Sequence, residues 1–158
     1  MISGPVVSNT TPLINLAGIA QLEILAGLYG GITMPSAVAD EYQAKAPSSD
    51  PDVTKLPWIT IVHEVPIEPS LPQLGAGEAE AISLAKRLAA RIVLIDERKA
   101  RGVAVSHGLV PVGTLAVLVR AKKQGIIPSV GPLVERMQAQ GRYFGDALIE
   151  QILRAVDE

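Results

Sequence analysis

Four polar residues occupy positions where a sheet of parallel strands gathers its reactive groups. Asn9 and Asp96 each come at the end of a short apolar run typical of a buried strand. Glu41 and Glu78 lie on predicted helices that flank such runs. Because ligands of open parallel sheets bind beyond the carboxyl ends of the strands, these four side chains are candidates for one crevice.

The chemistry that these residues predict is the binding of a hard divalent cation. The chain contains no Cys, which excludes disulfides, thiolate zinc sites and thiol catalysis. Carboxylate and amide oxygens suit Mg²⁺ or Mn²⁺, which are held by a few such ligands and keep several waters. An Asn at position 9 can coordinate a cation but brings no charge and cannot act as a base.

Each candidate also has a simpler interpretation. Asn9 and Asp96 precede predicted helices, where both residue types are common N-caps. Glu78 lies where a helix dipole favours an acid, and Glu41 could be an ordinary solvated helix residue. Only their joint placement at strand ends and helix starts favours a shared site.

Charge is distributed unevenly along the 158 residues, although the formal net charge is only -2. Residues 1–85 carry 2 basic and 9 acidic side chains, whereas residues 86–123 carry 9 basic and 2 acidic ones. Such asymmetry indicates a polyanionic partner. Arg98, Lys99 and Arg101 follow Asp96 closely and are the candidates for binding the phosphate backbone of such a partner.

Strands alternate with helices along the chain, which predicts a parallel α/β sheet with helices on both faces and a single domain over residues 1–158. Strands are expected at residues 6–7, 32–34, 58–62, 92–95 and 110–112, and helices at 13–28, from 35 onward, and at 78–90, 97–107, 114–124, 130–140 and 146–157. Residues 45–57 and 66–77 are expected to be loops, and Gly18 is a candidate break within the first helical segment.

Residues 1–22 carry no charged side chain but do not resemble an export signal. They lack a basic start and are interrupted by polar residues from Ser8 to Thr11, so we expect folded core there. No other uncharged apolar run approaches the roughly 18 to 20 residues of a membrane span. We therefore expect a soluble, cytoplasmic protein.

Several segments together resemble the PIN-domain superfamily, and more narrowly a prokaryotic branch of VapC-like toxins. These segments are VVSNTTPLI at residues 6–14, MPSAV through Glu41 at 34–41, GAGEAEAI at 75–82, LIDERKAR at 94–101 and VGTL at 112–115. The resemblance spans nearly the whole chain in the right order. It implies a three-layer α/β/α sandwich with a central parallel sheet and a metal-dependent ribonuclease activity.

The resemblance also implies which residues form the site. The acids of the family fall on Glu41, Glu78 and Asp96, which would be both catalytic and metal-binding, with Glu97 as a supplementary acid. The first acid falls on Asn9, where the family usually has Asp. This departure predicts weaker binding of Mg²⁺ or Mn²⁺ and weaker activation of water.

The leading hypothesis is a metal-dependent endoribonuclease of PIN type, the toxin of a toxin-antitoxin pair, with activity reduced by Asn9. Its expected partners are RNA, a cognate antitoxin and a second copy of the chain. A homodimer is suggested by the aliphatic segments Leu13–Leu28 and Thr114–Val119. One alternative is a catalytically impaired PIN-like module that binds RNA or an antitoxin. Another is an α/β domain whose strand-end acids are only helix caps.

Overall fold

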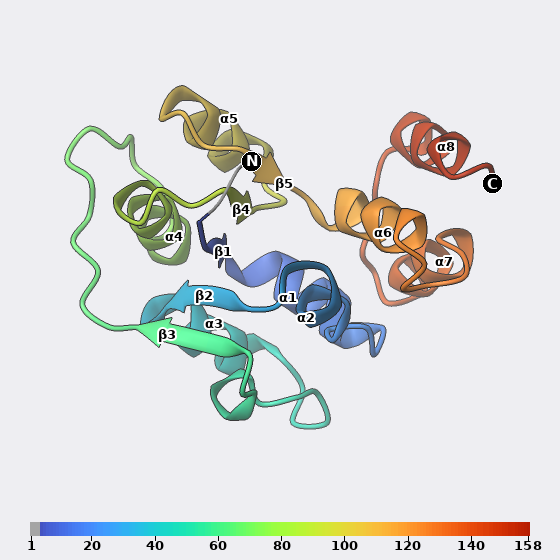
Figure 1. Cartoon of the computed structure of the whole chain (residues 1–158), viewed down its shortest axis with the longest axis horizontal. Helices are drawn as coiled ribbons and strands as arrows, with labels where there is room; N and C mark the ends of the chain where they lie inside the picture. The colour runs from blue at the N-terminus through green and yellow to red at the C-terminus, as the bar shows by residue number, and fades with distance from the viewer. Residues whose placement is uncertain (1–3) are drawn as a thin grey trace.

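Five parallel strands form the centre of the fold in the computed structural model, which describes residues 4–158 (Figure 1). The strands are β1 (Val6–Ser8), β2 (Ile32–Pro35), β3 (Ile59–Val62), β4 (Ile92–Leu94) and β5 (Pro111–Val112). They are ordered β3-β2-β1-β4-β5, and every neighbouring pair is parallel. The chain thus builds outward from β1 to one edge and then crosses back to β4, which leaves a switch point between β1 and β4.

Helices cover both faces of this sheet. The helices are α1 (Thr10–Gly18), α2 (Ile24–Tyr29), α3 (Ser36–Lys45), α4 (Ala76–Arg87), α5 (Arg98–Ser106), α6 (Thr114–Lys123), α7 (Gly131–Ala139) and α8 (Asp146–Ala155), with a short 3₁₀ helix at Val53–Lys55. Figure 1 shows α4 and α5 on one side of the sheet and α1, α2 and α6 on the other. The predicted three-layer α/β/α sandwich with a parallel sheet is therefore confirmed.

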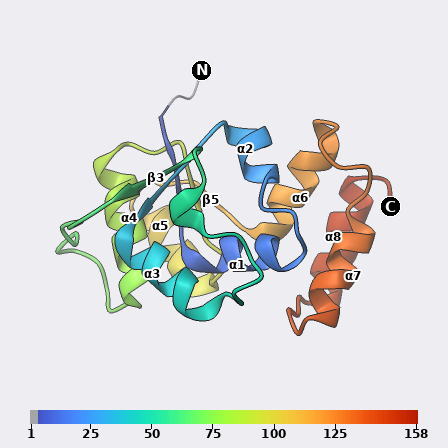
Figure 2. The same ribbon diagram turned by 90° about the horizontal axis from the view of Figure 1, so that it is seen from below.

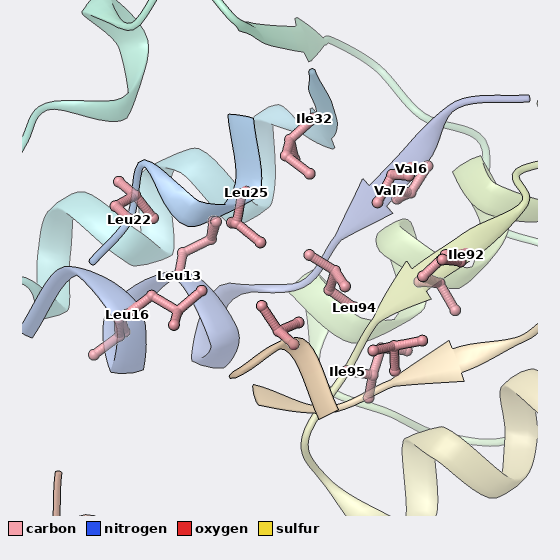
Figure 3. Packing of buried hydrophobic residues seen from close by; sticks show 14 of the residues in the cluster. Val6, Val7, Leu13, Leu16, Leu22, Leu25, Ile32, Ile92, Leu94 and Ile95 are labelled. Carbon is pink, nitrogen blue, oxygen red and sulfur yellow. The ribbon is translucent and has the colours of Figure 1, made fainter. Parts of the chain in front are cut away.

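The core is aliphatic and forms where the first helices meet the sheet. Val7 and Leu94 are fully buried in the sheet, as are Leu13, Leu16 and Leu25 from the helical side. Figure 3 shows these side chains packed between α1, α2 and strands β1 and β4. The expectation that residues 1–22 form folded core holds for most residues from Val6 onward, with Thr11 and Ala20 exposed, and residues 1–3 lie outside the described part.

The last three helices gather at one end of the molecule (Figures 1 and 2). The Glu158 carboxylate accepts hydrogen bonds from the backbone nitrogens of Val130 and Gly131, both at 2.8 Å, and pairs with Lys122 Nζ at 2.8 Å. These contacts tie the end of the described chain to α6 and to the start of α7. Within residues 4–158, no helix has the length and apolarity required to cross a membrane.

Element boundaries differ from the predictions by a few residues. The helix expected at 78–90 begins at Ala76 and ends at Arg87. Its first turn therefore includes Gly77, which is buried. Glycine allows this turn to pack closely against the neighbouring segments, and that approach shapes the candidate site.

Candidate active site

The switch point between β1 and β4 brings Asn9 and Asp96 to the same edge of the sheet. Asn9 directly follows β1, and its backbone N–H donates to Leu94 O of β4 at 2.9 Å. Asp96 lies two residues beyond the end of β4. The topology thus places both residues at the crevice where open parallel sheets bind ligands.

Three side-chain oxygens converge on Gly77 in the first turn of α4. A Cβ built on Gly77 would lie 3.2 Å from Glu41 Oε2, 3.4 Å from Asn9 Oδ1 and 3.5 Å from Thr10 Oγ1. The oxygens come from α3, from the end of β1 and from the start of α1. We call Asn9, Thr10, Glu41 and Gly77 the Gly77 cluster.

Two of the oxygens in the Gly77 cluster lack hydrogen-bond partners. Asn9 Oδ1 and Thr10 Oγ1 are both buried and unpartnered among residues 4–158. Asn9 occupies the N-cap position of α1, but its side chain makes no capping hydrogen bond. A buried polar atom without a partner costs about 1–3 kcal/mol and calls for an explanation such as an absent ion or water. The simple interpretation of Asn9 as a helix cap is therefore not supported.

Asp96 has the opposite environment, because its carboxylate is held by three hydrogen bonds. The backbone N–H of Thr114 donates to Asp96 Oδ1 at 2.7 Å, and the Thr114 hydroxyl donates to Oδ2. Asn15 Nδ2 donates to Oδ2 at 3.0 Å and also reaches Thr114 Oγ1 at 3.3 Å. We call Asp96, Thr114 and Asn15 the Asp96 cluster, in which only Asn15 Oδ1 is buried without a partner.

Glu97, rather than Asp96, caps the helix that follows β4. Its carboxylate accepts hydrogen bonds from Lys99 N at 3.1 Å and Ala100 N at 2.8 Å. These bonds, from Ala100 foremost and then from Lys99, lower the pKa of Glu97. The helix cap that the sequence suggested for Asp96 is therefore supplied by its neighbour Glu97, and Asp96 instead bonds to Thr114 and Asn15.

Glu78 lies near two other acidic side chains, Glu97 and Glu41. Burial raises the pKa of Glu78, and the negative charges of Glu97 and Glu41 raise it further. Gly75 N donates to Glu78 Oε1 at 3.3 Å and partly opposes this shift. The raised pKa indicates a carboxylate whose ionised form lacks a positive counter-charge.

The donor types of the crevice fit a hard divalent cation, although the acids do not form a compact cage. Among residues 4–158, no three Asp, Glu or His side chains are close enough together to hold an ion. The structure instead offers one carboxylate, one amide oxygen and one hydroxyl around Gly77, while Glu78 Oε1 lies near Gly75 and Asp96 Oδ1 near Gly113. Oxygen donors of this kind suit Mg²⁺ or Mn²⁺ with remaining waters, and the unpartnered Asn9 Oδ1 is available for a ligand.

The three basic residues predicted to bind RNA have different environments. Arg101 Nη1 lies 3.4 Å from a Cβ built on Gly113, a point that is also 3.0 Å from Asp96 Oδ1. Lys99 Nζ donates to Gln73 O at 3.1 Å and so anchors the loop before α4. Arg98 is exposed at the start of α5. Of the three, Arg101 is the one whose guanidinium lies beside Asp96.

Sequence reasoning missed the residues that position the predicted ones. Gly77, Thr114 and Asn15 were not assigned to the site, yet each contacts one of its members or approaches it closely. Asn15 did give a signal, because it is a lone amide within the apolar stretch from Pro12 to Ala17. Its bond to Asp96, 81 positions away, depends on the tertiary fold.

Comparisons with known proteins identify the family of the chain. A family model described as DUF3368, a PIN domain, matches residues 5–158. The fold is similar to the solved structure of a PilT N-terminus domain protein from the archaeon Sulfolobus solfataricus P2, with a TM-score of 0.57 and 15% sequence identity. That similarity covers 73% of this chain and 92% of the archaeal one. No curated protein sequence matches the chain. With a match that extends from residue 5 to residue 158, the chain belongs to the DUF3368 family of PIN domains.

Proposed function

We propose that this PIN domain protein is an endoribonuclease that depends on Mg²⁺ or Mn²⁺. PIN domains are in general divalent-metal-dependent nucleases, so family membership indicates a nuclease-type function. The observation that supports the more specific proposal is the convergence of Glu41, Asn9 and Thr10 on Gly77, where two buried oxygens lack partners. Such a group is costly to maintain unless a ligand completes it.

The two clusters would hold the cation from different directions. Glu41 and Asn9 would bind it from the Gly77 cluster, and Asp96 would bind it from the other side. A bound cation would supply positive charge that polarises the scissile phosphodiester and acidifies the attacking water. Thr114 and Asn15 fix the carboxylate of Asp96, so little reorganisation is needed on that side.

Glu78 is the proposed group for handling the proton of the attacking water. Its pKa is raised by burial and by the neighbouring acids, which makes its carboxylate a stronger base than an ordinary Glu. The hydrogen bond from Gly75 N orients the carboxylate at the start of α4. We assign Glu78 the orientation and deprotonation of water, while Glu97 remains a supplementary acid held at the cap of α5.

RNA is the proposed substrate, and the basic residues of α5 would bind its backbone. Arg101 lies beside Asp96, where a phosphate group could reach both the cation and the guanidinium. Arg98 is exposed and could contact a neighbouring phosphate, whereas Lys99 supports the loop at Gln73. We therefore expect Arg101 to contribute most to the binding of RNA.

The biological role that we propose is that of the toxin in a toxin-antitoxin pair, acting in the cytoplasm and bound by a cognate antitoxin. This role is supported by the resemblance to VapC-like toxins. A homodimer also remains a proposal. Leu13, Leu16 and Leu118, which suggested a dimer surface, are buried within the chain itself. Exposed apolar surface lies instead on α8, where no residue is buried and Leu148 is 43% exposed.

Cleavage of RNA by purified protein in the presence of Mn²⁺ tests the proposed activity. Asp96→Asn and Glu78→Gln should each lower the rate by about 100-fold or more, since each removes a charged group that acts on the reacting atoms. Glu135→Gln, on the exposed face of α7, is the matched control and should cleave like the unmodified chain. Equal cleavage by all four proteins would refute the assignment.

A second candidate function is favoured by the neutral side chain at position 9. A catalytically impaired module would bind RNA or an antitoxin without efficient hydrolysis. Asn9→Asp places a carboxylate in the Gly77 cluster, so we expect calorimetry to show Mn²⁺ binding at least about tenfold tighter, with a rise in cleavage. If the unmodified chain already binds Mn²⁺ tightly and cleaves RNA, the impaired-module alternative is rejected.

A further inference from the structure

A cleft of about 590 Å³ opens beside Asp96 and reaches the C-terminal segment of the described chain. Its lining joins Thr11 and Asp96 of the crevice to Arg142, Tyr143 and Phe144, which lie between α7 and α8. The volume is within the range of about 300–1,000 Å³ that is usual for small-ligand sites. The cleft is thus continuous with the proposed active site but includes residues that the site does not use.

Two arginines line this cleft from different elements. Arg101 comes from α5 and Arg142 from the segment after α7. Within residues 4–158, neither guanidinium forms a salt bridge. Their positive charge is therefore available to a ligand, and the planar donors of arginine match phosphate oxygens well.

Aromatic side chains are rare in this protein, yet two adjacent ones line the cleft. The chain has 1 Trp, 3 Tyr and 1 Phe, and both Tyr143 and Phe144 border the cleft. Phe144 packs partly against the core, whereas Tyr143 is 80% exposed. An exposed aromatic ring, next in the chain to a residue that packs partly against the core, provides a surface on which a nucleobase can stack.

The segment that presents these residues is anchored at α7, and the helix that follows it is anchored at its far end. Arg142 N donates to Met137 O at 2.9 Å, which fixes the segment to the last turn of α7. Beyond α8, Glu158 is bonded to Val130 N and Gly131 N at the start of α7. The fold therefore holds Arg142 and Tyr143 next to the crevice.

We propose that this cleft is a nucleotide subsite that holds one unit of single-stranded RNA beside the scissile phosphate. The base stacks on Tyr143, and Arg142 and Arg101 bind the flanking phosphates. The subsite rests on the proposed function because it requires RNA as substrate. Unpaired arginines next to an exposed aromatic ring suit a charged backbone with accessible bases, and single strands are the RNA form that is recognised by stacking.

Binding of a fluorescent single-stranded oligoribonucleotide to the full chain, measured by anisotropy in EDTA, tests the subsite separately from cleavage. Tyr143→Ala should weaken binding roughly 5- to 150-fold, the range for loss of one stacked base. Tyr143→Phe keeps the ring and should bind within about twofold of the unmodified chain. Arg142→Gln should lower affinity and reduce the slope of log affinity against log salt by about 1.

Arg136→Gln is the matched control, because Arg136 is exposed on α7 and does not line the cleft. It should bind RNA like the unmodified chain. The subsite proposal is overturned if the unmodified chain does not bind the oligoribonucleotide, or if Tyr143→Ala binds as tightly as Tyr143→Phe. The latter result is also expected if the cleft instead takes a peptide.

The two proposals fail in different ways. If binding depends on Tyr143 but no cleavage follows addition of Mn²⁺, the subsite stands and the endoribonuclease assignment falls. If the chain cleaves RNA and Tyr143→Ala changes neither KM nor affinity, the activity stands and the subsite is rejected. If both proposals are correct, Tyr143→Ala should raise KM by about the same factor by which it weakens RNA binding, and it should leave kcat nearly unchanged.

Discussion

The Gly77 cluster and the Asp96 cluster are both polar groups at the switch point of the sheet, but they differ in the hydrogen bonding of their side-chain oxygens. The Asp96 carboxylate and the Thr114 hydroxyl are bonded to one another and to Asn15. In the Gly77 cluster, by contrast, Asn9 Oδ1 and Thr10 Oγ1 have no partner. Apart from Asn15 Oδ1, the oxygens of the Asp96 cluster are thus bonded within the protein, whereas the Gly77 cluster is one that a ligand would complete. We infer that the Asp96 cluster is a prearranged support and that the Gly77 cluster is a surface for binding a ligand.

Alanine substitution at Gly77 and at Gly113, one glycine beside each cluster, should give the largest difference between the two clusters. In Gly77→Ala the new Cβ would lie 3.2 Å from Glu41 Oε2, the end of a flexible side chain that can shift by a few tenths of an ångström, and in ordinary contact with Asn9 Oδ1 and Thr10 Oγ1. Metal-dependent cleavage should fall about 100-fold through misplaced ligands, while Tm is kept or raised. In Gly113→Ala the Cβ would meet the bonded Asp96 Oδ1 at 3.0 Å, so both activity and Tm should fall.

Gly102→Ala provides the control for this pair. A Cβ at Gly102, on α5, would have no atom within 4 Å. Its only expected effect is a gain of about 0.5–1 kcal/mol from better helix propensity, with cleavage unchanged. Thermal unfolding and cleavage rates for the three variants check the contrast. Loss of Tm in Gly77→Ala equal to that in Gly113→Ala would show that the two clusters are equally constrained.

Removal of the threonine hydroxyls gives a contrast of intermediate size. Thr10 and Thr114 are both fully buried, but only the Thr114 hydroxyl is hydrogen-bonded. Thr114→Val should lower the free energy of unfolding by about 1–3 kcal/mol, because Asp96 and Asn15 lose a partner. Thr10→Val deletes an unpartnered oxygen and should be neutral or stabilising. Urea unfolding in EDTA measures the free energy of unfolding of both variants. Equal losses of stability in Thr10→Val and Thr114→Val would contradict the difference between the clusters.

The smallest predicted effect on stability is that of Glu78→Gln. Burial and the charges of Glu97 and Glu41 raise the pKa of Glu78 above its usual 4.5. The charged form is therefore destabilised in the folded protein, and this cost grows as pH rises through 4.5 and the raised pKa. At neutral pH without metal, Glu78→Gln should be more stable by roughly 0.5 kcal/mol, the scale of partly exposed charge interactions.

Thermal unfolding of Glu78→Gln and the unmodified chain at several pH values checks this sign. The two curves should converge at pH values below the usual pKa of Glu, where both side chains are neutral. Addition of Mn²⁺ at neutral pH should raise the Tm of the unmodified chain more than that of the variant, because the cation binds the folded state. A variant that is less stable than the unmodified chain at neutral pH would show that Glu78 has a favourable partner.

Much of the architecture could be predicted because it depends on local patterns. The apolar run at residues 92–95 and the spacing of leucines from residue 13 indicated a buried parallel strand and a core helix, and both are present. The parallel α/β class and its two helical layers follow from the alternation of such segments. Helix ends were predicted less well: α4 begins at Ala76, two residues before the expected Glu78, which instead caps the helix by accepting from Gly75 N.

The sequence by itself determined which residues could do chemistry: hard oxygen donors at strand ends, no thiols, and a basic stretch after an acidic half. Only the tertiary structure decided how those residues are used. Asn15 and Thr114 are distant from Asp96 in the chain, and Thr10 and Glu41 meet at Gly77 only through the packing of α1, α3 and α4. Local patterns encode the elements, but the bonding of a buried polar atom depends on which distant segment the fold brings beside it.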